Sequence, residues 1–196
     1  MARFTQAELQ TYYGASVPDL LPADDQPLRL LFVGINPGLW TAATQTHFAH
    51  PLNRFYPAIF RAGITNRPID ASAGMTAEDR DYFRARGIGF TNIVRRATAK
   101  ASELTNTELK EGGAELFSLV ARRLATQKGP DVVAIAGITA YRTAFNRPKA
   151  KQGRQPEPLA GSELWVVPNP SGLNAHETVP TLAAAYAEAA RAAGLL

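Results

Sequence analysis

The chain has 196 residues, of which 45% are hydrophobic and 19% are charged. These values are typical of a globular protein and exclude a long disordered chain, and the length suits a single domain with a substantial core. Its 21 basic and 17 acidic residues give a formal charge of +4 and a pI near 9.6. This balance permits an anionic partner such as DNA without identifying one.

The absence of cysteine restricts the chemistry further, because it excludes disulfides, thiol nucleophiles and cysteine-based zinc or iron–sulfur sites. The three histidines, His47, His50 and His176, lack the spacing of a metal site, so we expect no metal and no organic cofactor. No apolar run approaches the roughly 20 residues that span a bilayer, and the N-terminus lacks the apolar segment of a signal peptide. We therefore expect a bacterial-type intracellular protein, in the cytoplasm with the nucleoid, and no membrane partner.

The N-terminal half begins with a predicted short helix, because Thr5 and Glu8 have the spacing of a capping box. A proline-rich connector follows, and we treat residues 1–27 as an N-terminal extension and 28–196 as one domain. A buried strand at 30–35 ends in an Asn-Pro-Gly turn. Apolar spacing and a second capping box then predict helices at 53–63 and 75–87, before a strand at 87–94.

The C-terminal half opens with a long amphipathic helix at 105–129, although two consecutive glycines inside it lower the helix propensity. A buried strand at 131–137, a helix at 138–145, a basic loop, a strand at 163–168 and an alanine-rich helix at 178–193 follow. Short apolar strands that alternate with helices are typical of a parallel sheet covered on both faces. The sequence therefore predicts a three-layer α/β/α fold around a mostly parallel four-stranded sheet.

The first and fourth strands end alike, in "GINPGL" (34–39) and "PNPSGL" (168–173). In a parallel sheet these two turns lie at the same edge, where open α/β sheets bind their ligands. No dinucleotide motif, phosphate-binding loop or nucleophile elbow accompanies them. Asn36 in the first turn is therefore either a turn residue or a residue that takes part in chemistry.

Four motifs in order, "GINPGL", "HFAHPLNRFY", "GIGFTNIV" and "NPSGL", extend over most of the chain from about Leu30. In this combination the chain resembles the mismatch-specific uracil/thymine DNA glycosylases of the uracil-DNA glycosylase superfamily. The resemblance implies that superfamily's fold and an enzyme that flips uracil out of DNA and hydrolyses its N-glycosidic bond. The abasic product would enter base excision repair. The implied partner is double-stranded DNA with uracil or a mismatched pyrimidine, no cofactor is implied, and we expect a monomer.

The resemblance also suggests roles for residues near the base. Asn36 matches the family's catalytic asparagine, whose amide cannot act as a general base at neutral pH but can hold a water against the sugar carbon. Phe48 matches the aromatic residue that stacks on the flipped base, and backbone groups of Ile35 and Phe48 would read the base edge. Asn92 is either the pocket amide of the thymine-processing branch or a simple strand-end asparagine. Gly38 would let the backbone approach the ligand closely.

A second group of residues matches the loop that enters the duplex. Ser171, Gly172 and Leu173 form this loop, since small residues allow close approach and an apolar one can fill the gap left by the base. His176, a few residues later, is either a surface histidine or a further DNA contact.

Three positions depart from the family pattern. Ala175 stands where relatives commonly have an arginine near the widowed guanine, Arg95 where they often have an acid, and Ile138 where a lysine is common. Arg95 and Arg96 could instead meet phosphates. These departures leave open the range of bases excised, the preference for the opposite base and the activity on single strands.

The leading hypothesis is a monofunctional glycosylase that uses water, because the sequence offers no good lysine nucleophile for lyase chemistry at the crevice. The alternative is a catalytically inactive module on the same fold that binds DNA lesions. A third possibility, an enzyme on free nucleosides, would need neither the apolar loop nor a basic surface.

Overall fold

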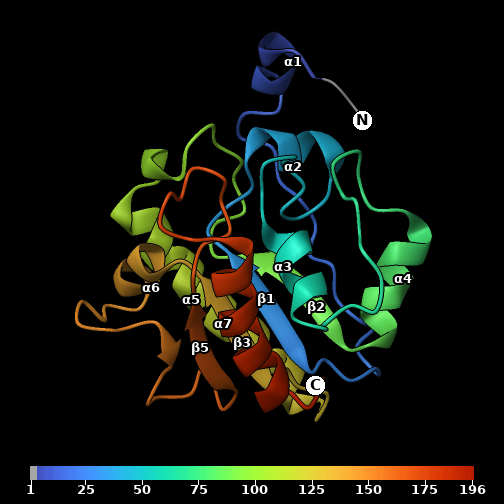
Figure 1. Ribbon diagram of the computed structural model, residues 1–196. Helices are drawn as coiled ribbons and strands as arrows, with labels where there is room; N and C mark the ends of the chain where they lie inside the picture. Colours follow the sequence, from blue (N-terminus) through green and yellow to red (C-terminus); the bar gives the residue numbers. More distant parts are fainter. Residues whose placement is uncertain (1–3) are drawn as a thin grey trace.

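The computed structural model describes residues 4–196, whose apolar runs form a sheet with helices on both faces (Figure 1). The sheet has the strand order β2-β1-β3-β5-β4. Its four parallel strands are β1 (Leu30–Gly34), β2 (Ile88–Asn92), β3 (Val132–Ala136) and β5 (Glu163–Val167). The predicted α/β/α fold with a mostly parallel sheet is therefore confirmed.

The sequence predicted four strands, but the sheet has five. The fifth strand, β4 (Gly153–Arg154), runs antiparallel to β5 within the stretch that the sequence indicated to be a loop. Arg154 pairs in register with Trp165 and forms an ion pair with Glu163. This two-residue strand exists through its pairing with the edge of β5, and no local pattern of the sequence encodes such pairing.

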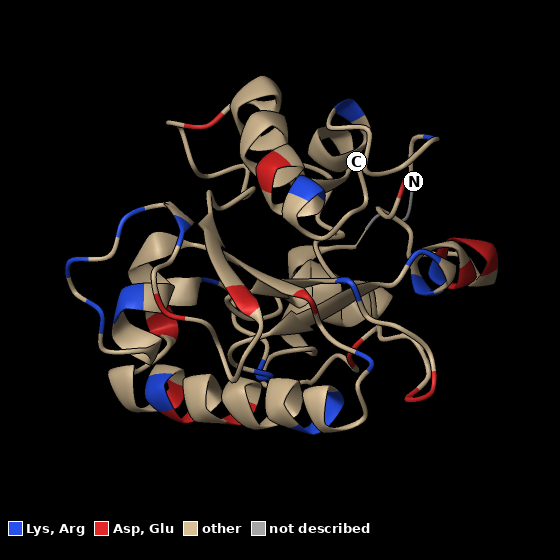
Figure 2. Ribbon diagram, turned by 90° about the horizontal axis from the view of Figure 1, so that it is seen from below, with Lys and Arg blue, Asp and Glu red and all other residues tan. Residues whose placement is uncertain are grey.

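Alternating side chains of the strands supply two separate cores. Leu30 and Phe32 point toward α3 (Phe55–Arg61) and α7 (Val179–Ala192), which cover one face of the sheet. Residues 31 and 33 point to the opposite face and pack against α5 (Asn106–Ala125) and α6 (Ile138–Ala144). Figure 2 shows this layering, with the long helix α5 on the face opposite α7.

The remaining helices follow from local sequence signals to different degrees. Capping boxes form as predicted at the starts of α1 (Gln6–Gln10), α4 (Ala77–Ala85) and α5 (Asn106–Ala125). The predicted helix after β3 is α6 (Ile138–Ala144). Two one-turn elements were not predicted, α2 (Leu39–Thr44) and the 3₁₀ helix η1 (Ala101–Glu103), because they are too short to show a helical period. No helix in residues 4–196 is long and apolar enough to cross a membrane.

Residues 14–20, which we call the N-terminal arm, lie antiparallel along the outer edge of β2. Leu20 and Phe90 exchange both backbone hydrogen bonds, at 3.0 and 2.8 Å, and Ala97 N–H donates to the carbonyl of Ala15 at 2.8 Å. Val17 and Leu20 are buried against the domain. The arm therefore covers a strand edge that would otherwise present unpaired backbone groups to solvent.

The two glycines inside α5 are explained by close packing. A Cβ atom at Gly112 would lie 2.1 Å from the carbonyl oxygen of Ile93, and one at Gly113 would lie 2.8 Å from that of Ala144. Glycine therefore lets α5 approach the segment that follows β2 as well as the end of α6. The close packing requires glycine at both positions, and glycine lowers the helix propensity of α5.

We expect Gly112→Ala to lower the free energy of unfolding by about 1–3 kcal/mol, because overpacking against Ile93 outweighs the gain in helix propensity. Urea denaturation of the variant and the wild type measures this change. Ser118→Ala on the exposed face of α5 is the control and should stay within about 0.5 kcal/mol of wild type. A Gly112→Ala protein as stable as wild type would contradict the packing argument.

Candidate active site

A cavity of about 610 Å³ opens at the carboxyl ends of β1 and β2. Three stretches that are far apart in the sequence line it: the turn after β1 with the loop around Phe48, the end of β2 with the following loop, and the loop after β5. The lining residues include Gly34, Ile35, Asn36, Gly38, Phe48, Asn92, Ser171, Gly172 and Leu173. His176 is exposed on the loop after β5 and does not line the cavity.

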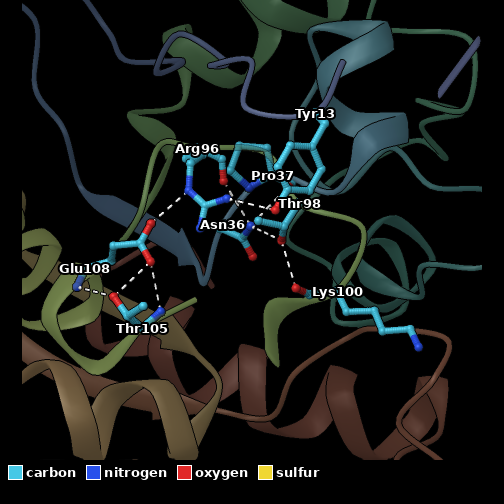
Figure 3. Close-up of polar contacts among 8 residues, drawn as sticks. All are labelled: Tyr13, Asn36, Pro37, Arg96, Thr98, Lys100, Thr105 and Glu108. Carbon is cyan, nitrogen blue, oxygen red and sulfur yellow. Dashed lines mark hydrogen bonds and ion pairs between the residues drawn. The ribbon is translucent and has the colours of Figure 1, made fainter. Parts of the chain in front are cut away.

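The side-chain amide of Asn36 is held by three acceptors. Its Nδ2 donates to Thr98 Oγ1 at 2.7 Å and to the carbonyl oxygens of Arg96 and Pro37 at 3.0 and 3.2 Å (Figure 3). Two of these three partners are backbone carbonyls, which can only accept. The group that faces them must be the amide NH2, so the orientation of the amide is determined chemically.

The amide oxygen of Asn36 consequently faces away from these partners. Within residues 4–196 it accepts no hydrogen bond, and Asn36 is half-buried at the cavity wall. An oriented acceptor of this kind can hold a water molecule by one of its protons and leave the water's lone pair free to attack.

Thr98 extends the anchoring by one step. Its hydroxyl accepts from Asn36 and donates to the carbonyl oxygen of Lys100 at 2.9 Å, so its proton has a defined position. The N–H of Thr98 in turn donates to the carbonyl of Pro37 at 3.1 Å. The loop after β2 and the turn after β1 are therefore joined at the point where Asn36 projects.

An ion pair also anchors the loop after β2. Arg96 Nε donates to Glu108 Oε1 at 2.8 Å, and the guanidinium lies over the ring of Tyr13 at 5.8 Å (Figure 3). Hydrogen bonds from Arg96 and then from Thr105 lower the pKa of Glu108 to about 2. The pair is therefore charged throughout the physiological range, and it ties the backbone that accepts from Asn36 to the start of α5.

Phe48 presents an aromatic ring in an unusual backbone conformation. One ring face stacks on Phe55, with centroids 4.1 Å apart and 15° between the planes, and the residue also lines the cavity. Its φ of 57° lies in the left-handed region, which is uncommon for a residue other than glycine. Such strain is concentrated at functional sites, where packing holds the residue in place.

Asn92 and the Phe48 ring both lie next to Gly34 at the cavity wall. A Cβ atom at position 34 would lie 2.4 Å from the Asn92 Oδ1 and 3.4 Å from the Phe48 ring. Glycine at position 34 therefore leaves the space that both side chains occupy. At Gly38, which also lines the cavity, an added Cβ would meet nothing within 4 Å.

The loop after β5 is organised by Arg54, a residue that the sequence analysis did not single out. Its guanidinium donates to the carbonyls of Ser171, Gly172 and Asn174, at 3.0–3.3 Å, and to that of Glu177. No carboxylate within residues 4–196 pairs with it. The positive charge therefore stays at the base of this loop, where a phosphate could approach.

Two exposed leucines flank the cavity mouth. Leu173 is 87% exposed and Leu52 is 70% exposed, and both line the cavity. Gly172 packs directly on Leu52, since a Cβ there would lie 2.6 Å from the Leu52 carbonyl oxygen. Leu52 was missed by the sequence analysis, because an isolated leucine in a loop carries no signal of exposure.

The three positions that were expected to depart from the family pattern lie in different surroundings. Arg95 forms an ion pair at 2.9 Å with Asp19 of the N-terminal arm, Ala175 is exposed, and Ile138 packs partly buried against the core under α5. Lys100 also lines the cavity. In Figure 3 its side chain extends away from Asn36.

Among the described residues no three histidine, aspartate or glutamate side chains are placed together to hold a metal ion. The histidine at the cavity wall, His50, accepts at Nδ1 from the backbone N–H of Leu52 at 3.1 Å. Asn53 likewise supports the loop, since its Oδ1 accepts from the N–H of Phe55 at 2.9 Å.

The fold and the cavity define an α/β protein with a candidate ligand site at the carboxyl ends of its parallel strands. A family model described as the uracil DNA glycosylase superfamily matches residues 22–191, most of the chain. The chain therefore belongs to the uracil DNA glycosylase superfamily. This membership supports a hydrolytic DNA glycosylase that acts on uracil.

We expect Thr98→Val to lower the rate of base excision by up to about tenfold, since it removes one of the acceptors that orient the Asn36 amide. Thr98→Ser keeps the hydroxyl and should retain most of the activity. Single-turnover assays on a uracil-containing duplex compare the two variants. Equal losses in both would indicate that the methyl group, and not the hydrogen bond, matters at this position.

Proposed function

We propose that the protein is a monofunctional DNA glycosylase of the mismatch-specific uracil/thymine type. It would flip uracil out of a G·U pair in double-stranded DNA and hydrolyse the N-glycosidic bond as a monomer. The observation that carries this proposal is the Asn36 amide, whose NH2 group is fully engaged and whose oxygen is free at the cavity wall. Thymine and other damaged pyrimidines are further candidate substrates.

In this mechanism Asn36 positions the attacking water. The water donates a hydrogen bond to Oδ1 and directs a lone pair at the sugar C1′. The bond between C1′ and the base nitrogen breaks, its electron pair leaves with the base, and the water oxygen bonds to C1′. The amide takes no proton, so the excess proton passes to solvent. The transition state has cationic character on the sugar, and its stabilisation depends on groups that stabilise the departing base anion.

The base would lie against the free face of Phe48. That ring is already fixed on its other face by Phe55, so stacking requires little further ordering. Asn92 and backbone groups of Ile35 and Phe48 would read the base edge. Within the described chain the N–H and carbonyl of Phe48 make no hydrogen bond, so both are free for a ligand.

The exposed loop after β5 would fill the gap in the duplex. Leu173 would enter the stack, and the Ser171–Gly172 backbone would approach the DNA closely. Arg54 would hold the loop in shape and supply positive charge. His176 would contribute a contact at the edge of the same surface.

We expect Asn36→Ala to lower the single-turnover rate on a labelled G·U duplex by about 100-fold or more, because the water loses its position. Strand breaks should appear only after alkali treatment, since a water nucleophile leaves an intact abasic site. Asn66→Ala, at an exposed asparagine outside the cavity, is the matched control.

Two outcomes would contradict this proposal. Duplex binding by the wild type without any breaks would favour an inactive lesion-binding module. Breaks without alkali, together with borohydride trapping that depends on Lys100, would indicate lyase chemistry instead of water attack.

We expect Leu173→Ala to lower excision about tenfold on duplex substrate and to have little effect on single-stranded substrate. The reason is that a wedge is needed only where the base must leave a stack, and the truncation removes apolar surface that would be buried there. Leu196→Ala, at an exposed leucine at the C-terminus, is the control. The chain terminus lies at the opposite end of the sheet from the site (Figure 1). Equal losses on both substrates would contradict the wedge.

A further inference from the structure

A buried histidine connects the N-terminal arm to the cavity. His47 Nε2 lies 3.1 Å from the carbonyl oxygen of Pro18 in the arm, and its Nδ1 lies 3.2 Å from Asn92 Nδ2. The residue is 3% exposed, and the hydroxyl of Tyr56 donates to its carbonyl at 2.7 Å. The arm lies before residue 22, where the match to the family begins.

The chemistry of the three groups fixes the direction of both hydrogen bonds. The Pro18 carbonyl can only accept, so Nε2 carries the proton. In a neutral imidazole the other nitrogen is then an acceptor, and it must face the NH2 group of Asn92. The Asn92 oxygen is thereby turned to the other side, into the space left by Gly34 at the cavity wall.

The neutral imidazole is consistent with its surroundings. Burial lowers the pKa of His47 to about 4, and the nearby guanidinium groups of Arg80 and Arg95 act in the same direction. The hydrogen bond to Pro18 and the carboxylate of Asp19 oppose this shift without cancelling it. At neutral pH the imidazole can therefore donate to Pro18 and accept from Asn92 at the same time, and we call this pair of hydrogen bonds the relay.

We propose that His47 is a positioning residue through which the N-terminal arm orients the base-reading amide of Asn92. The Pro18 carbonyl sets the imidazole tautomer, and the imidazole holds the amide with its oxygen toward the bound base. This inference rests on the proposed function, since it gives the specificity of the same site.

The fixed oxygen determines which pyrimidines fit. Uracil and thymine carry an N–H at ring position 3, which can donate to the Asn92 oxygen. Cytosine has a bare nitrogen at that position, and two acceptors would face each other. Sites built to hydrogen-bond a particular group discriminate strongly against analogues that lack it. The relay therefore selects against the normal base cytosine, which a uracil glycosylase in DNA must not remove.

The orientation of the Asn92 amide should also depend on pH. Protonation of His47 would place an N–H against the NH2 group of Asn92, and the amide would have to turn. Because the pKa of His47 is lowered to about 4, the preference is present above that pH and is lost as the pH falls through it.

The first test needs no catalysis. Long-range ¹⁵N–¹H spectra of the uniformly labelled wild-type protein report the tautomer of each histidine, and His47→Gln assigns the signal. We expect the Nε2–H tautomer of His47 from pH 8 down to about pH 5. The opposite tautomer, or a titration near the ordinary value of about 6.5, would overturn the proposal.

The second test uses a matched pair of variants. His47→Asn places an amide oxygen near the position of Nδ1 and can still accept from Asn92, whereas His47→Gln reaches the position of Nε2 and keeps only the bond to the arm. Binding is measured with duplexes that contain the non-hydrolysable 2′-fluoroarabino analogue of deoxyuridine or of deoxycytidine. We expect the uracil-to-cytosine affinity ratio to fall about tenfold in His47→Gln and to be largely restored in His47→Asn.

The outcomes separate this inference from the proposed function. An unchanged ratio in His47→Gln, or equal losses in both variants, would overturn the positioning role. A wild-type protein that binds both duplexes equally would overturn the selectivity together with the proposed function. In that case the measured tautomer of His47 would still show whether the hydrogen bonds to Pro18 and Asn92 form as inferred.

Discussion

The amide of Asn36 imposes the constraint on which the site depends. A half-buried NH2 group needs acceptors, and two of the three that it meets are carbonyls that cannot donate. The amide therefore cannot rotate by 180° without placing its oxygen against other oxygens. The end of β1, the loop after β2 and the Arg96–Glu108 pair at the start of α5 are held together around this requirement.

The amide on the neighbouring strand is oriented in the same way. Asn92 at the end of β2 also has its NH2 group engaged, here by the unprotonated nitrogen of His47. The two amides, one in the turn after β1 and one at the end of β2, thus turn their oxygens toward one cavity. In the proposed mechanism the oxygen of Asn36 holds water and that of Asn92 meets the base. In that mechanism neither amide places a charged group at the reacting carbon.

Short-range patterns predicted one part of the site and could not predict the other. The strands, the turns at their ends and the candidates Asn36, Phe48 and Leu173 are visible because each belongs to a local motif. Thr98 and Arg54 are not, since their partners lie 62 and more than 100 residues away along the chain. Most of these partners are backbone carbonyls, which every residue possesses, so the sequence marks none of them. β4 was missed for the same reason, because only its pairing with β5 makes it a strand.

Arg95 connects the segment after β2 to the N-terminal arm. Arg95 places a positive charge just beyond the end of β2. In this chain Asp19 of the arm pairs with Arg95 and also accepts from the hydroxyl of Thr91 at 2.7 Å. The preceding residue, Pro18, supplies the carbonyl to His47. The ion pair at position 95 therefore helps to dock the segment that contacts His47, and His47 in turn links the arm to Asn92 at the cavity wall.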